Sequence, residues 1–163
     1  MFIPFEEIPP ASRIWIYQAD RKLSKAEVEE INKRATNFLK EWAAHGNQLA
    51  CSAKIFHDQF LIITVNEDFN LPSGCSIDSS ISFIRTLESD FILSFLDRSK
   101  VAFIINDQVY LESVPNLKKK ISEGFIKEDT PVFNNLINKK IELENKWIVP
   151  AKNSWLNKYF RQK

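Results

Sequence analysis

The sequence predicts an α+β fold, and three observations support this class. Segments 12–18, 60–65 and 101–106 are apolar on both alternating sets of residues, which is typical of strands buried on both faces. Segments 24–45 and 73–91 repeat apolar residues with the period of an α-helix. Strands and helices alternate along the chain. We therefore expect a core over residues 12–114, within a single domain that spans residues 1–163.

The first expected helix carries signals at both ends. Ser24 followed by Glu27 predicts a capping box at its start. His45 and Gly46 predict its end, because an imidazole suits the negative end of the helix dipole and glycine adopts the left-handed stop. The second helix is expected to begin within SGCSIDSS, residues 73–80, where a serine would cap the first turn.

The order of the elements predicts the sheet. The order β-α-β-β-α-β is that of the split βαβ, or ferredoxin-like, arrangement, here with an added edge strand. The expected strand order is 5-4-1-3-2, with edges at 49–56 and 109–114, the two strands that have half-polar patterns. Residues 115–163 are expected to form a helical, aromatic-rich C-terminal tail, with a helix that starts at Thr130 and Pro131.

The composition argues against several function classes. There are 22 basic and 21 acidic residues, a net charge of +1, which does not favour nucleic acid as a partner. Trp15 and Tyr17 could stack bases only if their face of the sheet were open. The N-terminal segment lacks the basic region of a signal peptide, and no apolar run is long enough to span a bilayer. We therefore expect a soluble, cytoplasmic protein with no membrane partner.

Known phosphate and metal motifs are missing. The three glycines, Gly46, Gly74 and Gly124, do not fit a GxxxxGK[ST] or GxGxxG loop. Two histidines and two cysteines are scattered and show no metal-ligand spacing. We expect no ATPase activity, no cofactor and no metal site. Cys51 is expected in the core, since it alternates in phase with apolar neighbours.

The segment SGCSIDSS carries the most suggestive chemistry. Cys75 would lie in the first turn of a helix, where free backbone amides favour a thiolate. His45, at the end of the first helix, would lie at the same end of the sheet, and a Cys–His pair is one way to activate a nucleophile. Two other interpretations stay open: a plain helix cap without chemistry, or a ligand or partner site. The candidate binding residues are Gly74, Ser76, Asp78 and Ser79.

Several segments carry a resemblance that covers nearly the whole chain. They are FIPFEEIPPASRIWIYQADR, SGCSIDSSISFI, DRSKVAF, VFNNLI and VPAKNSWL. In these segments the chain resembles a family of small bacterial proteins commonly labelled "ABC transporter ATPase". The label implies ATP hydrolysis, but neither a Walker A motif nor an LSGGQ-like signature can be placed in this sequence. The resemblance implies no catalytic role for any particular residue.

The sequence thus favours a domain that binds a small ligand or a protein partner. One alternative is a thiol-dependent enzyme that uses Cys75 with His45. Another is a structural or assembly protein that pairs through the edge strand 109–114, which would make a homodimer.

Overall fold

The computed structural model describes residues 1–161, and the chain forms two compact units. Unit 1 comprises residues 1–96 and 138–141, and unit 2 comprises 97–137 and the residues from 142 onward. Both units combine strands with helices, so the α+β class is confirmed. Whether the two units act as one domain stays a prediction. Within residues 1–161, no helix combines the length and apolar character needed to cross a membrane.

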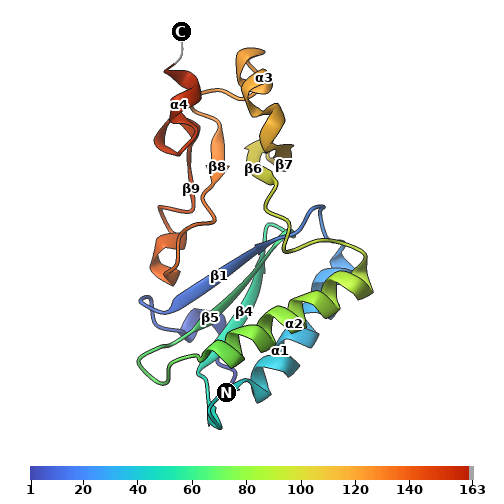
Figure 1. The fold of residues 1–163 in the computed structure, drawn as a ribbon, viewed down its shortest axis with the longest axis vertical. Helices are drawn as coiled ribbons and strands as arrows, with labels where there is room; N and C mark the ends of the chain where they lie inside the picture. Colours follow the sequence, from blue (N-terminus) through green and yellow to red (C-terminus); the bar gives the residue numbers. More distant parts are fainter. Residues whose placement is uncertain (162–163) are drawn as a thin grey trace. The chain divides into compact units, whose positions relative to one another are not determined.

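Unit 1 is a three-stranded antiparallel sheet with two long helices against one face (Figure 1). The strand order is β1-β5-β4, so the third strand of this sheet along the chain lies in its middle. The elements are β1 (Arg13–Gln18), α1 (Lys25–Glu41), β2 (Ala43–Ala44), β3 (Asn47–Gln48), β4 (Cys51–Phe56), β5 (Phe60–Val65) and α2 (Gly74–Phe91).

The core of unit 1 lies between this sheet and the two helices. Leu61 and Ile63 of β5 pack in one cluster with Leu39 of α1 and Ile84 of α2. The same cluster contains the buried Tyr17 and the partly buried Trp15. The helices therefore cover the face of β1 that carries these two rings, and this face is not an open platform for bases.

Both helix starts confirm the local sequence signals. Ser24 Oγ accepts from the Glu27 N–H at 3.1 Å, and the Glu27 carboxylate accepts from the Ser24 N–H at 2.8 Å. Ser73 and Ser76 make the same reciprocal pair at the start of α2. Such boxes satisfy amides that the first turn of a helix leaves without partners.

The end of α1 corrects the sequence analysis. The helix ends at Glu41, and Ala43–Ala44 pair with Asn47–Gln48 as a short hairpin. His45 and Gly46 form the turn of this hairpin, with φ of 52° and 80°. Positive φ at both central residues is the type I′ geometry that matches the twist of the strands. His45 therefore lies on a hairpin tip and not at a helix end.

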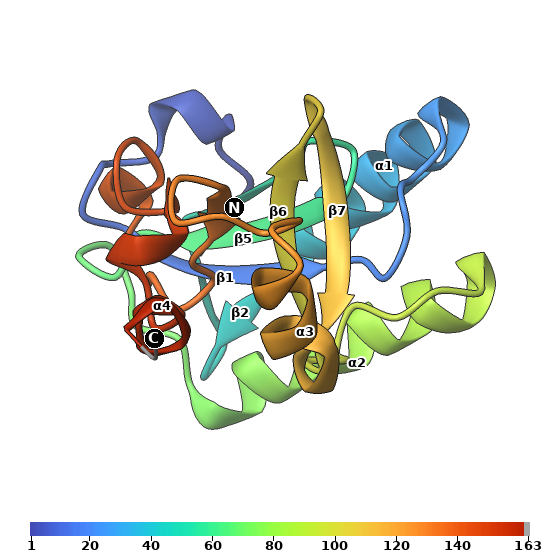
Figure 2. The same cartoon turned by 90° about the horizontal axis from the view of Figure 1, so that it is seen from above.

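Unit 2 contains the second sheet, with strand order β7-β6-β8-β9 and antiparallel pairing throughout (Figure 2). Its buried core joins Phe103 of the sheet to Leu117, Ile126 and Leu156. The elements are β6 (Lys100–Ile105), β7 (Gln108–Ser113), α3 (Leu117–Ser122), β8 (Pro131–Phe133), β9 (Ile148–Pro150) and α4 (Asn157–Phe160).

The ferredoxin-like topology is not confirmed, although some of its strand pairings are present. The antiparallel order β1-β5-β4 and the β6–β7 hairpin match the expected pairings. The expected pairing of β6 with β1 is not found, because β6 pairs with β7 and β8. Beside β1 lie residues 138–141 instead, with the Ile14 N–H donating to Asn138 O at 3.0 Å. The fourth-strand position is thus taken by a segment from much later in the chain.

The C-terminal tail is also corrected. The expected helix at Thr130 and Pro131 is strand β8, and residues 148–150 form strand β9. Helix α3, Leu117–Ser122, does lie within the expected helical tail. Proline is also tolerated as the first residue of a strand, and Pro131 is the first residue of β8. The Thr-Pro signal is therefore compatible with a helix start or with a strand start.

Ile92, just after α2, supports a stability prediction. It has φ of 52° and ψ of 62°, in the left-handed region, and its side chain is 87% exposed. This backbone conformation costs a β-branched residue about 1–2 kcal/mol, and burial of the exposed Ile92 side chain offsets little of that cost. We expect Ile92→Gly to raise the free energy of unfolding by about 0.5–1 kcal/mol in urea titration, after the entropy cost of glycine. Ile92→Val keeps the β-branch and should give no gain; a less stable glycine variant would contradict the argument.

The edge position of β7 supports an exchange prediction. Ile105 and Gln108 flank a two-residue turn and form the first hydrogen-bonded pair of the β6–β7 hairpin. Every second N–H of β7, starting at Gln108, therefore points toward β6, and the N–H groups of Val109 and Leu111 point away from it. We expect the Val109 and Leu111 amides to exchange with deuterium at least about tenfold faster than those of β5, which is paired on both sides. Slow exchange at both positions would show that another chain covers this edge.

Candidate functional site

The serines of the SGCSIDSS segment serve mainly as caps. Ser73 Oγ accepts from the Ser76 N–H at 3.1 Å, and Ser76 Oγ accepts from the Ser73 N–H at 2.7 Å. Ser76 is buried, so its hydroxyl is committed to the first turn of α2. A Cβ added at Gly74 would meet no atom within 4 Å, so close packing does not require glycine there. Most of this segment is explained by helix initiation.

Cys75 and His45 are both exposed; Cys75 lies on the expected element, and His45 does not. Cys75 lies in the first turn of α2, and His45 lies at the tip of the β2–β3 hairpin. Within residues 1–161 no hydrogen bond between these two side chains is found. Asp78 is exposed on α2 as well. The proposed nucleophilic pair therefore stays a hypothesis, without a contact that supports it.

Cys51 is buried in the core, as the sequence predicts. Its Sγ lies 3.4 Å from Leu39 O and 3.6 Å from Met1 O, within the reach of weak S–H hydrogen bonds. Burial raises the pKa of this thiol to about 11, although the N-terminal ammonium opposes the shift. Cys51 is thus a packed thiol with little thiolate at neutral pH.

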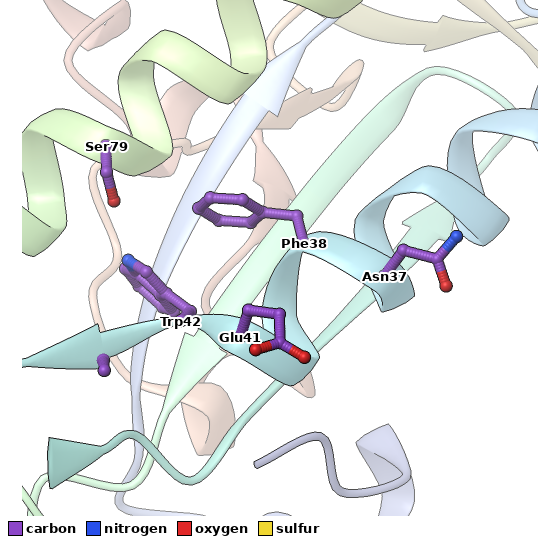
Figure 3. A pocket seen from close by; sticks show the side chains of 6 residues that line it. Asn37, Phe38, Glu41, Trp42 and Ser79 are labelled. Atoms are coloured by element: carbon purple, nitrogen blue, oxygen red, sulfur yellow. The ribbon is translucent and has the colours of Figure 1, made fainter. Parts of the chain in front are cut away.

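A pocket of about 320 Å³ opens where the end of α1 meets α2 (Figure 3). This volume is at the lower end of the range for small-molecule sites. Phe38 and Trp42 point from α1 toward α2, and Ser79 points from α2 back toward them (Figure 3). The lining residues are Asn37, Phe38, Glu41, Trp42, Ala43 and Ser79.

Trp42 holds the two helices together at this pocket. Its indole N–H donates to Ser76 O in the first turn of α2, at 2.8 Å in a buried position. The Trp42 ring meets Trp15 of β1 edge to face, with centroids 6.2 Å apart. Phe38 stacks on Phe83 of α2 with centroids 4.6 Å apart and an interplanar angle of 3°. The aromatic wall is therefore rigid and joins three elements.

The polar side chains of the pocket differ in their hydrogen-bond partners. Ser79 Oγ donates to Ser76 O at 2.9 Å. The side chains of Asn37 and Glu41 are exposed, and within residues 1–161 neither has a hydrogen-bond or ion-pair partner. Glu41 is the single charged group among the lining residues. Two solvent-exposed polar side chains, without a protein partner among the described residues, thus lie at the opening of an aromatic pocket.

Of the residues expected from the sequence, Ser79 alone lines this pocket. Phe38 and Trp42 belong to the apolar repeat of the expected helix 24–45, and both pack against the core of unit 1. Trp42 points toward α2 from the residue that follows the end of α1. No local sequence pattern predicts that α1 ends there. The sequence signal for the pocket is the pair Asn37 and Glu41, which lie one helical turn apart next to these apolar residues.

No family model, curated protein or solved structure matches this chain.

The two thiols should differ strongly in reactivity. We expect iodoacetamide at pH 8 to alkylate Cys75 in the folded protein and to leave Cys51 unmodified until the protein unfolds, since Cys51 is buried and its pKa is raised. Mass spectrometry of tryptic peptides over a time course measures both rates.

The His45→Ala variant tests the pair itself. A plain helix cap predicts the same dependence of Cys75 alkylation on pH in the variant and in the wild type. An inflection below pH 8 that the variant moves upward would support a thiolate assisted by the imidazole. Rapid alkylation of Cys51 in the folded protein would contradict its placement in the core.

Proposed function

We propose that unit 1 binds a small organic ligand in the pocket between α1 and α2. One observation carries the proposal: a rigid aromatic wall stands beside two polar side chains, Asn37 and Glu41, that have no partner within residues 1–161. Concave sites with an apolar wall and a few convergent polar groups are the usual form of small-molecule sites.

The lining residues indicate the chemistry of the ligand. The Phe38 ring stacks on Phe83 and also contacts the tilted Trp42 ring, so the wall offers apolar contact and ring edges. The Glu41 carboxylate accepts hydrogen bonds, and the Asn37 amide both donates and accepts. We infer a ligand with a compact apolar part and a hydrogen-bond donor, such as an amine or a hydroxyl group. Glu41 would repel a phosphate, so nucleotides do not fit this proposal.

Pairing through β7 is a second candidate, and its position at the end of the second sheet favours it. An edge strand offers unpaired backbone groups to another chain. The Val109 and Leu111 amides report on such pairing directly.

Three fragments with the same ring test the ligand proposal. Benzylamine, benzyl alcohol and benzoate differ only in the group attached to the ring. We expect the first two to shift the backbone amide signals of residues 37–43 and Ser79 in ¹⁵N NMR spectra at millimolar concentration, and benzoate to bind more weakly because of Glu41. Benzylamine should bind about two- to fivefold more tightly than benzyl alcohol, the scale of an exposed ion pair.

Matched variants locate the site. Glu41→Gln should remove the preference for benzylamine, and Glu29→Gln, an exposed carboxylate elsewhere on α1, should leave it unchanged. If none of the three fragments shifts these signals at 10 mM or so, a level at which weak fragments still bind, the pocket is no ligand site.

A further inference from the structure

The outer surface of unit 2 around α3 and α4 gathers lysines and exposed rings. The two short helices contact each other, and Leu117 and Leu156 anchor them in the core of the unit. Ile121, Tyr159 and Phe160 also pack against this core. Lys118, Lys119, Trp155 and Lys158 are exposed at its surface. We call this the basic–aromatic surface; it consists of Lys118, Lys119, Lys120, Phe125, Trp155 and Lys158.

The rings of this surface are unusually accessible. Trp155 is 47% exposed and Phe125 is 43% exposed. A tryptophan normally buries most of its large surface, and exposed ones are enriched where a partner binds. The other three tryptophans of the chain are buried or half-buried. Trp155 is therefore the tryptophan that has surface to offer to a ligand.

An ammonium group lies beside each exposed ring. The Lys158 Nζ is 5.4 Å from the centroid of Trp155 and 5.3 Å from that of Tyr159. The Lys120 Nζ is 5.1 Å from the centroid of Phe125. A ligand that contacts a ring of this surface thus meets a positive charge at the same point.

The positive charge of the surface is weakly compensated. Lys118 and Lys158 have no ion-pair partner within residues 1–161. Lys119 and Lys120 have acidic neighbours only at 3.9 and 4.0 Å. Unit 2 as a whole carries 11 Lys and Arg against 8 Asp and Glu, a net charge of +3, whereas unit 1 carries 11 against 13, a net charge of −2. The near-neutral total charge hides this difference between the units.

We propose that the basic–aromatic surface binds single-stranded nucleic acid. Lysines would neutralise backbone phosphates, and unpaired bases would stack on Trp155 and Phe125, the two features that sites for single strands combine. An anionic membrane is the weaker fit. A helix that lies in a membrane surface presents one long amphipathic stripe, whereas α3 and α4 are six and four residues long. An acidic protein segment would use the lysines but would have no bases for the exposed rings.

Binding of a fluorescein-labelled 12-nucleotide oligo(dT) to the full chain tests this proposal by anisotropy. Oligo(dT) has little structure of its own, so stacking on the protein is not masked. We expect binding at 50 mM salt that weakens as salt is raised, with a Kd in the micromolar range typical of sequence-independent contacts. Trp155→Ala should weaken binding about 5- to 100-fold, the scale for loss of one stacked base. The Lys118→Gln, Lys158→Gln double variant should lower the slope of log K against log salt by about 1.4, or 0.7 per phosphate contact.

Controls in unit 1 carry the same residue types. Lys25→Gln and Phe69→Ala replace an exposed lysine and a 57% exposed ring, and neither should change the affinity. Because Trp155 and the lysines are exposed, thermal melts of all variants should match the wild type.

Three outcomes would overturn the proposal. The first is no binding at 50 mM salt with 100 µM or so of protein, well above the range expected for such contacts. The second is binding that the lysine variant weakens but Trp155→Ala does not, which would indicate a general anion or acidic-peptide surface. The third is competition of the oligonucleotide by vesicles of phosphatidylserine and phosphatidylcholine at equal charge concentration, with tighter binding to the vesicles, which would indicate a membrane surface.

Discussion

The buried hydrogen bond from the Trp42 indole to Ser76 O is the interaction on which the architecture of unit 1 depends. A buried donor without a partner would cost about 1–3 kcal/mol, so the ring must reach the first turn of α2. To do so, Trp42 leaves the helix with ψ of 127°, and α1 ends there. The β2–β3 hairpin and the pocket wall both follow from this early end. One side-chain contact thus sets a helix length, a turn and a candidate ligand site.

Signals that act over a few residues predicted the structure well. The Ser24–Glu27 box, the start of α2 near Ser73 and the burial of Cys51 all depend on neighbours in sequence or on simple alternation. The predicted end of α1 was wrong because Trp42, just after the helix, bonds to Ser76, which is far along the chain. His45 suited a helix end chemically, yet it lies in a turn, and the Cys75–His45 pair stays a hypothesis.

Long-range pairing explains why the sheet was predicted only in part. An apolar strand such as β6 matches any buried position in a sheet, and its pattern does not name its neighbours. The partners that the structure gives it include Val132, in a segment whose Thr-Pro start resembles a helix cap. β1 is likewise apolar on both faces, and its neighbours are β5 on one side and residues 138–141 on the other. Pairings of this separation depend on the whole chain.

The four tryptophans differ in how much of each ring the fold uses. Trp42 and Trp147 donate to Ser76 O and to Asn135 Oδ1, and Trp15 packs against Trp42. These contacts use the apolar rings and the N–H groups of Trp42 and Trp147, so a role in stability is enough to explain these tryptophans. Trp155 has only Tyr159 and Lys158 beside it and remains half exposed. The exposed part of the Trp155 ring is the surface on which the proposed single strand would stack.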